Sequence, residues 1–138
     1  MIFVDSNVIL DIVTDDKNWA TWSLDQVSTA LSVGPIVTNA IVYAETSVRI
    51  PTMGEMDDIL ARLGVEIREM PKGVLFLAGK AFGQYRNFGG SRAGILPDFL
   101  IGAHAAYLSV PLLTRDTRRY RSYFPQLELI APDSPAIG

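Results

Sequence analysis

Four acidic side chains interrupt apolar stretches of this sequence. Asp5 directly follows the hydrophobic run IFV, and Asp116 follows the apolar pair in LLTRD. Glu45 lies on the apolar face of the helical pattern AIVYAETSV, and Asp98 lies near the start of the apolar stretch ILPDFLIGAHAAYL. A carboxylate is costly to bury unless it is paired or binds a metal. Together the four acids predict one electronegative pocket. Oxygen ligands without Cys or His favour Mg²⁺, with Mn²⁺ as the alternative.

Each acid also has a simpler interpretation. Asp5 is a good N-cap for a following helix, and Asp98 is suited to the positive end of a helix dipole. Glu45 has a potential ion-pair partner one helical turn later, at Arg49. Asp116 is suited to a turn or to pairing with its arginine neighbours. Separate interpretations explain the four acids less well as a set. Four acids in one pocket would raise one another's pKa by repulsion, and a divalent cation would remove that repulsion.

Short apolar strands that alternate with helical patterns must position these acids. The sequence predicts strands at 2–4, 36–38, 65–70, 111–114 and 127–130, and helices at 6–13, 19–33, 40–50, 53–63, 71–88 and 97–109. Asn18 and Asn39 are expected to cap the second and third helices. Such alternation is typical of a parallel sheet covered on both faces. Ligands of these sheets lie beyond the carboxyl ends of the strands, which is where Asp5 and Asp116 occur.

The composition predicts one globular domain. The chain has 138 residues, of which 49% are hydrophobic and 20% charged, enough for a substantial core. We expect a single domain over residues 1–130 and a flexible tail over 131–138, which is rich in proline. No apolar stretch is long enough to span a membrane, and the start MIFVDSN does not resemble a signal peptide. The absence of cysteine suits a reducing cytoplasm.

Positive charge is concentrated in the second half of the chain. Residues 1–70 contain 4 Lys or Arg and 11 Asp or Glu, whereas residues 71–138 contain 8 and 4. The densest basic cluster is formed by Arg115, Arg118, Arg119 and Arg121. Such a patch is suited to an anionic partner such as a nucleic acid. The alternative is an ordinary solvated face.

The ordered set VDSNVIL, NAIVYAE, ILPDFLIGAHA and LLTRDTRRYRSYFP resembles the PIN-domain nucleases, and most closely the VapC-type toxins of bacterial toxin–antitoxin pairs. The resemblance extends over about residues 1–130. It implies an α/β fold, a three-layer α/β/α PIN-like domain with a short, mostly parallel five-stranded sheet. It also implies that Asp5, Glu45, Asp98 and Asp116 are the catalytic, metal-holding acids.

The resemblance assigns supporting roles as well. Asn7 is expected to support Asp5 by a hydrogen bond, and Thr114 occupies the family's hydroxyl position beside the site. The substrate phosphates are expected to lie against the basic cluster and one further arginine, namely Arg115, Arg118, Arg119, Arg121 and Arg92. Tyr120 or Tyr123 is a candidate for stacking on an unpaired base, although aromatic side chains at this spacing more often pack in the protein. His104 is interpreted as a structural histidine.

The function implied is that of a cytoplasmic endoribonuclease toxin that hydrolyses RNA with a metal-activated water. The substrate class is open between tRNA, rRNA and mRNA. A VapB-type antitoxin and a homodimer are the implied protein partners. The alternative is a PIN-like module that binds RNA or protein without cutting. A magnesium-dependent phosphotransferase is disfavoured, because that class needs an acid pair at strand one and a lysine after a late strand.

Overall fold

Five short parallel strands form the centre of the protein. The computed structural model describes residues 1–90 and 95–132. The strands are β1 (Ile2–Val4), β2 (Ile36–Thr38), β3 (Val65–Ile67), β4 (Leu112–Leu113) and β5 (Leu129–Ile130). They lie in the order β3-β2-β1-β4-β5, and each neighbouring pair is parallel. The predicted parallel sheet is therefore confirmed.

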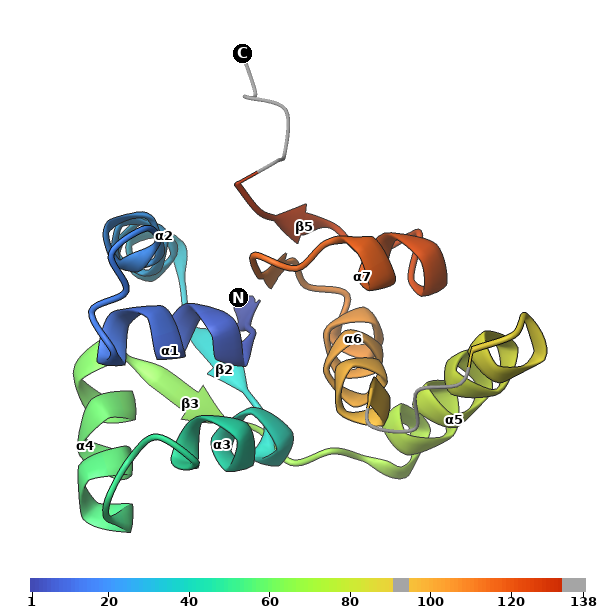
Figure 1. Cartoon of the computed structure of the whole chain (residues 1–138), viewed down its shortest axis with the longest axis horizontal. Coiled ribbons are helices and arrows are strands. Elements are labelled where there is room, and N and C mark those ends of the chain that lie inside the picture. Colours follow the sequence, from blue (N-terminus) through green and yellow to red (C-terminus); the bar gives the residue numbers. More distant parts are fainter. Residues whose placement is uncertain (91–94, 133–138) are drawn as a thin grey trace.

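Helices cover the sheet in the three-layer α/β/α arrangement that the sequence predicts (Figure 1). Figure 1 shows α1 to α4 on one side of the view and α5 to α7 on the other. No helix in the described part of the chain is long and apolar enough to cross a membrane. The helices are α1 (Ser6–Val13), α2 (Ala20–Val33), α3 (Ala40–Ser47), α4 (Met53–Leu63), α5 (Lys72–Asn87), α6 (Leu96–Leu108) and α7 (Arg118–Tyr123).

Polar caps begin several helices at the ends of strands. Asn39 caps α3 as predicted, since its side-chain oxygen accepts from the amides of Ile41 and Val42 at 3.0 and 3.2 Å. The prediction that Asn18 caps α2 is wrong. The Asp16 carboxylate instead accepts from the amides of Asn18 and Trp19, both at 2.9 Å. Asp16 takes the capping role because its carboxylate faces both of these amides, and the Asn18 side chain forms no cap on α2.

Two other boundaries differ from the sequence prediction by three residues, and one helix has no predicted counterpart. Helix α3 ends at Ser47 and continues only as a turn toward Ile50, because the residue before a proline disfavours helical geometry. Strand β3 ends at Ile67 rather than 70, since its partner β2 ends at Thr38 and gives way to α3. Helix α7 was not predicted at all.

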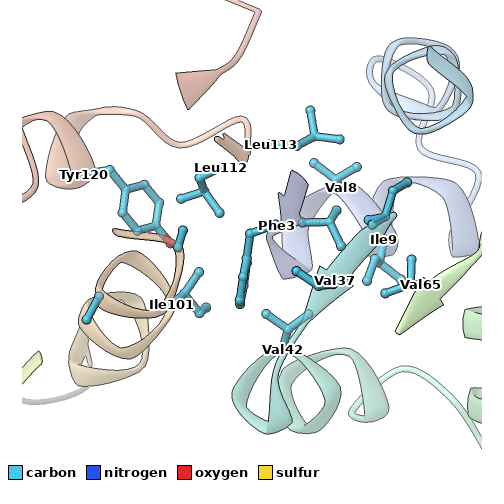
Figure 2. Packing of buried hydrophobic residues seen from close by; sticks show 14 of the residues in the cluster. Phe3, Val8, Ile9, Val37, Val42, Val65, Ile101, Leu112, Leu113 and Tyr120 are labelled. Carbon is cyan, nitrogen blue, oxygen red and sulfur yellow. The ribbon is translucent and has the colours of Figure 1, made fainter. Parts of the chain in front are cut away.

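The core joins the sheet to both helical layers (Figure 2). Phe3 and Val4 of β1 and the β4 leucines are fully buried, and Ile101 of α6 packs into the same cluster. Strand β1 has β2 on one side and β4 on the other. The chain therefore reverses its strand order beside β1, and the carboxyl ends of β1 and β4 lie next to each other. This is the position at which such sheets bind ligands.

Candidate functional site

Asp5 is the centre of the candidate site, and it is almost fully buried at 3% exposure. It ends β1 and caps α1, and its Oδ1 accepts from the Ser6 amide at 2.7 Å. Its Oδ2 accepts from the hydroxyls of Thr114 at 2.8 Å and Tyr120 at 3.0 Å. Burial raises the pKa of Asp5, and these hydrogen bonds oppose that rise. The capping and site interpretations of Asp5 are thus compatible.

Asn7 and Thr114, the two supporting residues that the family resemblance suggests, both lie within hydrogen-bonding distance of Asp5. The Asn7 amide nitrogen lies 3.4 Å from Asp5 Oδ2 and 3.2 Å from the Thr114 hydroxyl oxygen. The Asn7 side-chain oxygen accepts from the Arg115 amide at 3.1 Å. One asparagine therefore joins the start of α1 to the loop after β4. This link fixes the two strand ends that carry the acids.

Glu45 reaches the same site from α3. Its Oε1 accepts from the Ser6 hydroxyl at 2.9 Å, and that hydroxyl lies 3.4 Å from Asp5 Oδ1. Burial and then the nearby charge of Asp5 raise the pKa of Glu45. No ion pair joins Glu45 to Arg49 within the described ranges. The simpler interpretation of Glu45 as half of a helical ion pair therefore finds no support.

Asp98 lies in the first turn of α6, where it is partly buried and forms an ion pair with Arg119 of α7. Burial, together with the charges of Asp5, Glu45 and Asp116, raises the pKa of Asp98 to about 6 despite the opposing effect of Arg119. Asp98 is thus close enough to the other three acids for their charges to act on it. Asp116 is the most exposed of them, and its amide donates to the Thr114 hydroxyl at 3.0 Å.

The donor set is chemically suited to a hard divalent cation. All four acids supply oxygen, and their mutual repulsion is the kind that a bound cation relieves. In the conformation described for residues 1–90 and 95–132, however, no three acidic side chains converge closely enough to hold an ion. Asp98 is instead paired with Arg119. The residues therefore fit the ion in type, and closer convergence requires side-chain movement.

Comparison with known proteins identifies this arrangement. A model of the PIN domain matches residues 2–125. The chain belongs to the PIN domain family. No curated protein matches the sequence.

Solved structures agree with the PIN fold. A chain of VapBC2 from Rickettsia felis, bound to a promoter DNA fragment, is 19% identical with a TM-score of 0.69, and the match covers 96% of this chain and 100% of that chain. VapBC-1 from nontypeable Haemophilus influenzae is 17% identical with a TM-score of 0.70, and the match covers 95% of this chain and 98% of that chain. FitAcB from Neisseria gonorrhoeae is 20% identical with a TM-score of 0.63, and the match covers 96% of this chain and 98% of that chain. These identities establish a shared fold.

The arginine cluster of this PIN domain is divided between different tasks. Arg115 donates to the buried Asp11 carboxylate at 2.6 and 2.7 Å and stacks on Trp19 at 5.0 Å. Arg119 pairs with Asp98. Arg118 and Arg121 are exposed, and Arg92 lies outside the described residues. Arg115 and Arg119 are therefore engaged in ion pairs within the described part of the protein, which sequence analysis did not predict.

A groove opens beside the acids of the PIN domain, between α5 and α7. Its volume is about 440 Å³, and it is lined by Tyr85, Asp116, Arg118, Arg119, Ser122 and Tyr123. The groove thus places an acid of the site, two basic side chains and two aromatic rings together. This is a suitable surface for a segment of nucleic acid.

Two aromatic predictions have different outcomes in the PIN fold. His104 is buried, and its Nδ1 lies 3.1 Å from the Asn39 amide nitrogen, so its structural interpretation is consistent with the geometry. Burial lowers the pKa of His104. Tyr120 is 2% exposed and hydrogen bonds to Asp5, which removes it as a stacking surface. The sequence did not predict the hydrogen bond from Tyr120 to Asp5. The spacing of Tyr120 and Tyr123 indicated only that aromatic rings in a helix usually pack in the protein.

Proposed function

We propose that this PIN domain is a metal-dependent endoribonuclease and the toxin of a toxin–antitoxin pair. The observation that carries the proposal is the electrostatic coupling of Asp5, Glu45, Asp98 and Asp116 beside a basic groove. Family membership supports the nuclease class. The likeness to chains of VapBC and FitAB complexes supports the toxin role.

Mg²⁺, or Mn²⁺ in its place, would be held by oxygens of Asp5, Glu45, Asp98 and Asp116. When bound, such an ion lowers the pKa of water and neutralises charge on the phosphoryl group. The protein residues do the remaining work. Thr114 and Asn7 orient Asp5, while Arg118 at the groove offers a cation to a substrate phosphate. Arg121 and Arg92 remain candidates for further phosphate contacts, and Arg119 and Arg115 would contact phosphate only on leaving their acids.

The proposed substrate is single-stranded RNA in a tRNA, rRNA or mRNA. The groove beside Asp116 carries the rings of Tyr85 and Tyr123, and unpaired bases expose the faces that aromatic rings bind. We further propose a VapB-type antitoxin partner, a homodimeric state and a cytoplasmic location. The antitoxin and the cytoplasmic location follow from the toxin role, because free toxin must be restrained in the compartment that holds its RNA, and the homodimer is proposed from the family resemblance.

A non-catalytic PIN-like module that binds RNA or protein is the second candidate function. One specific observation favours it: Arg119 occupies Asp98, and the described acids do not converge on one point. A module of this kind would keep the groove and its RNA affinity without hydrolysis.

Cleavage of total bacterial RNA by the purified, antitoxin-free chain tests the proposal. We expect discrete fragments with Mg²⁺ or Mn²⁺, none with EDTA, and none from Asp98→Asn. The matched control is Asp58→Asn, since Asp58 is an exposed acid of α4 that pairs with Arg62, and this variant is expected to cut normally. RNA binding without cleavage by the wild-type chain in either metal would instead establish the binding module.

A further inference from the structure

Tyr120 carries a hydroxyl into the interior that the proposed chemistry has not used. Figure 2 shows its ring reaching inward from α7 toward the core, and the residue is 2% exposed. A buried hydroxyl costs free energy unless it finds a hydrogen-bond partner. Its partner is Asp5 Oδ2, at 3.0 Å. A phenylalanine would fill the same space without that contact, so the hydroxyl group adds only the hydrogen bond to Asp5.

The donors around Asp5 are divided unequally between its two oxygens. Oδ2 receives the hydroxyls of Thr114 and Tyr120 and the longer contact from Asn7. A carboxylate oxygen has about two lone-pair positions, so these donors fill Oδ2. Within the described residues, Oδ1 receives the Ser6 amide at 2.7 Å and a contact of 3.4 Å from the Ser6 hydroxyl. That hydroxyl has a closer acceptor in Glu45.

Oδ1 is also the oxygen of Asp5 that is linked to Glu45. The Ser6 hydroxyl lies between Asp5 Oδ1 and Glu45 Oε1, at 3.4 and 2.9 Å. The free lone pair of Asp5 is therefore on the oxygen nearer to Glu45. A cation shared by these two carboxylates would use Oδ1 and leave Oδ2 to its protein donors.

Packing around α7 keeps the Tyr120 ring in this position. Gly102 of α6 faces it, and a Cβ atom there would lie 3.0 Å from Tyr120 Cδ1 and 2.6 Å from Phe124 Cε2. The Phe124 amide in turn donates to the Tyr120 carbonyl at 2.8 Å. The glycine thus lets α6 and α7 approach closely enough for the hydroxyl to reach Asp5.

We propose that Tyr120 is a positioning residue that occupies Oδ2 of Asp5 and so reserves Oδ1 for the divalent cation. The proposal rests on the metal-dependent function proposed above. Groups that orient metal ligands in this way change metal affinity by about 10–100-fold when they are removed.

Titration calorimetry with Mn²⁺ on the antitoxin-free chain tests the proposal. We expect Tyr120→Phe to keep the wild-type circular dichroism and to bind Mn²⁺ about tenfold more weakly. Thr114→Val, which removes the other short hydroxyl donor to Oδ2, is expected to weaken Mn²⁺ binding as well. Tyr107→Phe is the control, because Tyr107 is an exposed residue of α6, and its Mn²⁺ affinity is expected to equal that of wild type.

The outcomes separate this proposal from the function on which it rests. If folded Tyr120→Phe has the Mn²⁺ affinity of wild type and only a lower melting temperature, the positioning role is overturned. RNA cleavage by the wild-type chain would leave the nuclease proposal intact in that case. The same affinity in Thr114→Val would overturn the reservation of Oδ1 independently of how Tyr120→Phe folds. A wild-type chain that neither binds Mn²⁺ nor cuts RNA would overturn both proposals.

Discussion

At the scale of single residues, three of the four acids are buried or partly buried at a cost in free energy. Asp5, Glu45 and Asp98 all have a raised pKa, chiefly through burial. The proteins that tolerate such groups usually do so at functional sites. Asp98 is the clearest case, since even an ion pair with Arg119 leaves its pKa near 6. These carboxyl groups therefore lower the stability of the metal-free fold when they are charged.

We expect Asp98→Asn to stabilise the metal-free protein at pH 7.5. The folded chain holds the Asp98 proton more tightly than the unfolded chain, because its pKa is about 6 against an ordinary 3.8. The contribution of the Asp98 carboxyl group to the free energy of unfolding is therefore complete below about pH 3.8 and is lost as the pH rises through 6. Urea unfolding in EDTA should show the variant about 1–3 kcal/mol more stable at pH 7.5, with a smaller difference at pH 5. A variant less stable at pH 7.5 would contradict this.

Residue chemistry explains how far the site could be predicted. Asn7 and Thr114 were predictable only through the family resemblance, because each lies in a short motif that also carries an acid of the site. The contacts of Arg119 and Tyr120 were not, because they depend on the angle at which a separate helix crosses α6. A sequence pattern gives the face on which a residue lies but not the partner that meets it.

At the scale of elements, the missing piece was α7. It has six residues, fewer than two turns, so hydrophobic periodicity has little to act on. Helix α4 was predicted closely because its stop is explicit, the left-handed Gly64, and the start of α3 was predicted because Asn39 caps it. Strand ends were less accurate, since they depend on where the neighbouring strand stops.

The contact between α6 and α7 predicts the effect of a methyl group at Gly102. We expect Gly102→Ala to destabilise the fold by about 1–3 kcal/mol, because the added Cβ would overlap the buried rings of Phe124 and Tyr120. Thermal unfolding measures the change. Gly79→Ala on α5 is the matched control: a Cβ there meets no heavy atom within 4 Å, so the higher helix propensity of alanine should stabilise it by up to about 1 kcal/mol. Equal effects of the two substitutions would argue against close packing of α6 on α7.

At the scale of the whole molecule, the two halves of the chain differ in charge and meet at the site. The acidic half supplies Asp5 and Glu45, and the basic half supplies Asp98, Asp116 and the arginines. The parallel sheet order brings them together, because β1 and β4 are neighbours. The fold class was therefore predictable from the alternation of strands and helices, whereas the division of arginines between structure and solvent was not.

Salt dependence tests the basic groove at this scale. We expect Arg118→Ala, made in the Asp98→Asn background so that RNA stays intact, to weaken RNA binding and to reduce the salt slope by about one charge. Arg62→Ala on α4 is the control, since Arg62 is exposed and pairs with Asp58. Fluorescence anisotropy between low and physiological salt gives both slopes. An unchanged slope for Arg118→Ala would place the RNA on another face.

The donors of Asp5 come from far along the chain, and this has a consequence for folding. Thr114 is 109 positions and Tyr120 is 115 positions away. Contacts between residues so distant in sequence close a long loop of chain and form slowly during folding. The orientation of Asp5 therefore depends on the docking of β4 and α7 beside β1. A partly folded chain in which those two elements are detached lacks the arranged site that we propose for catalysis.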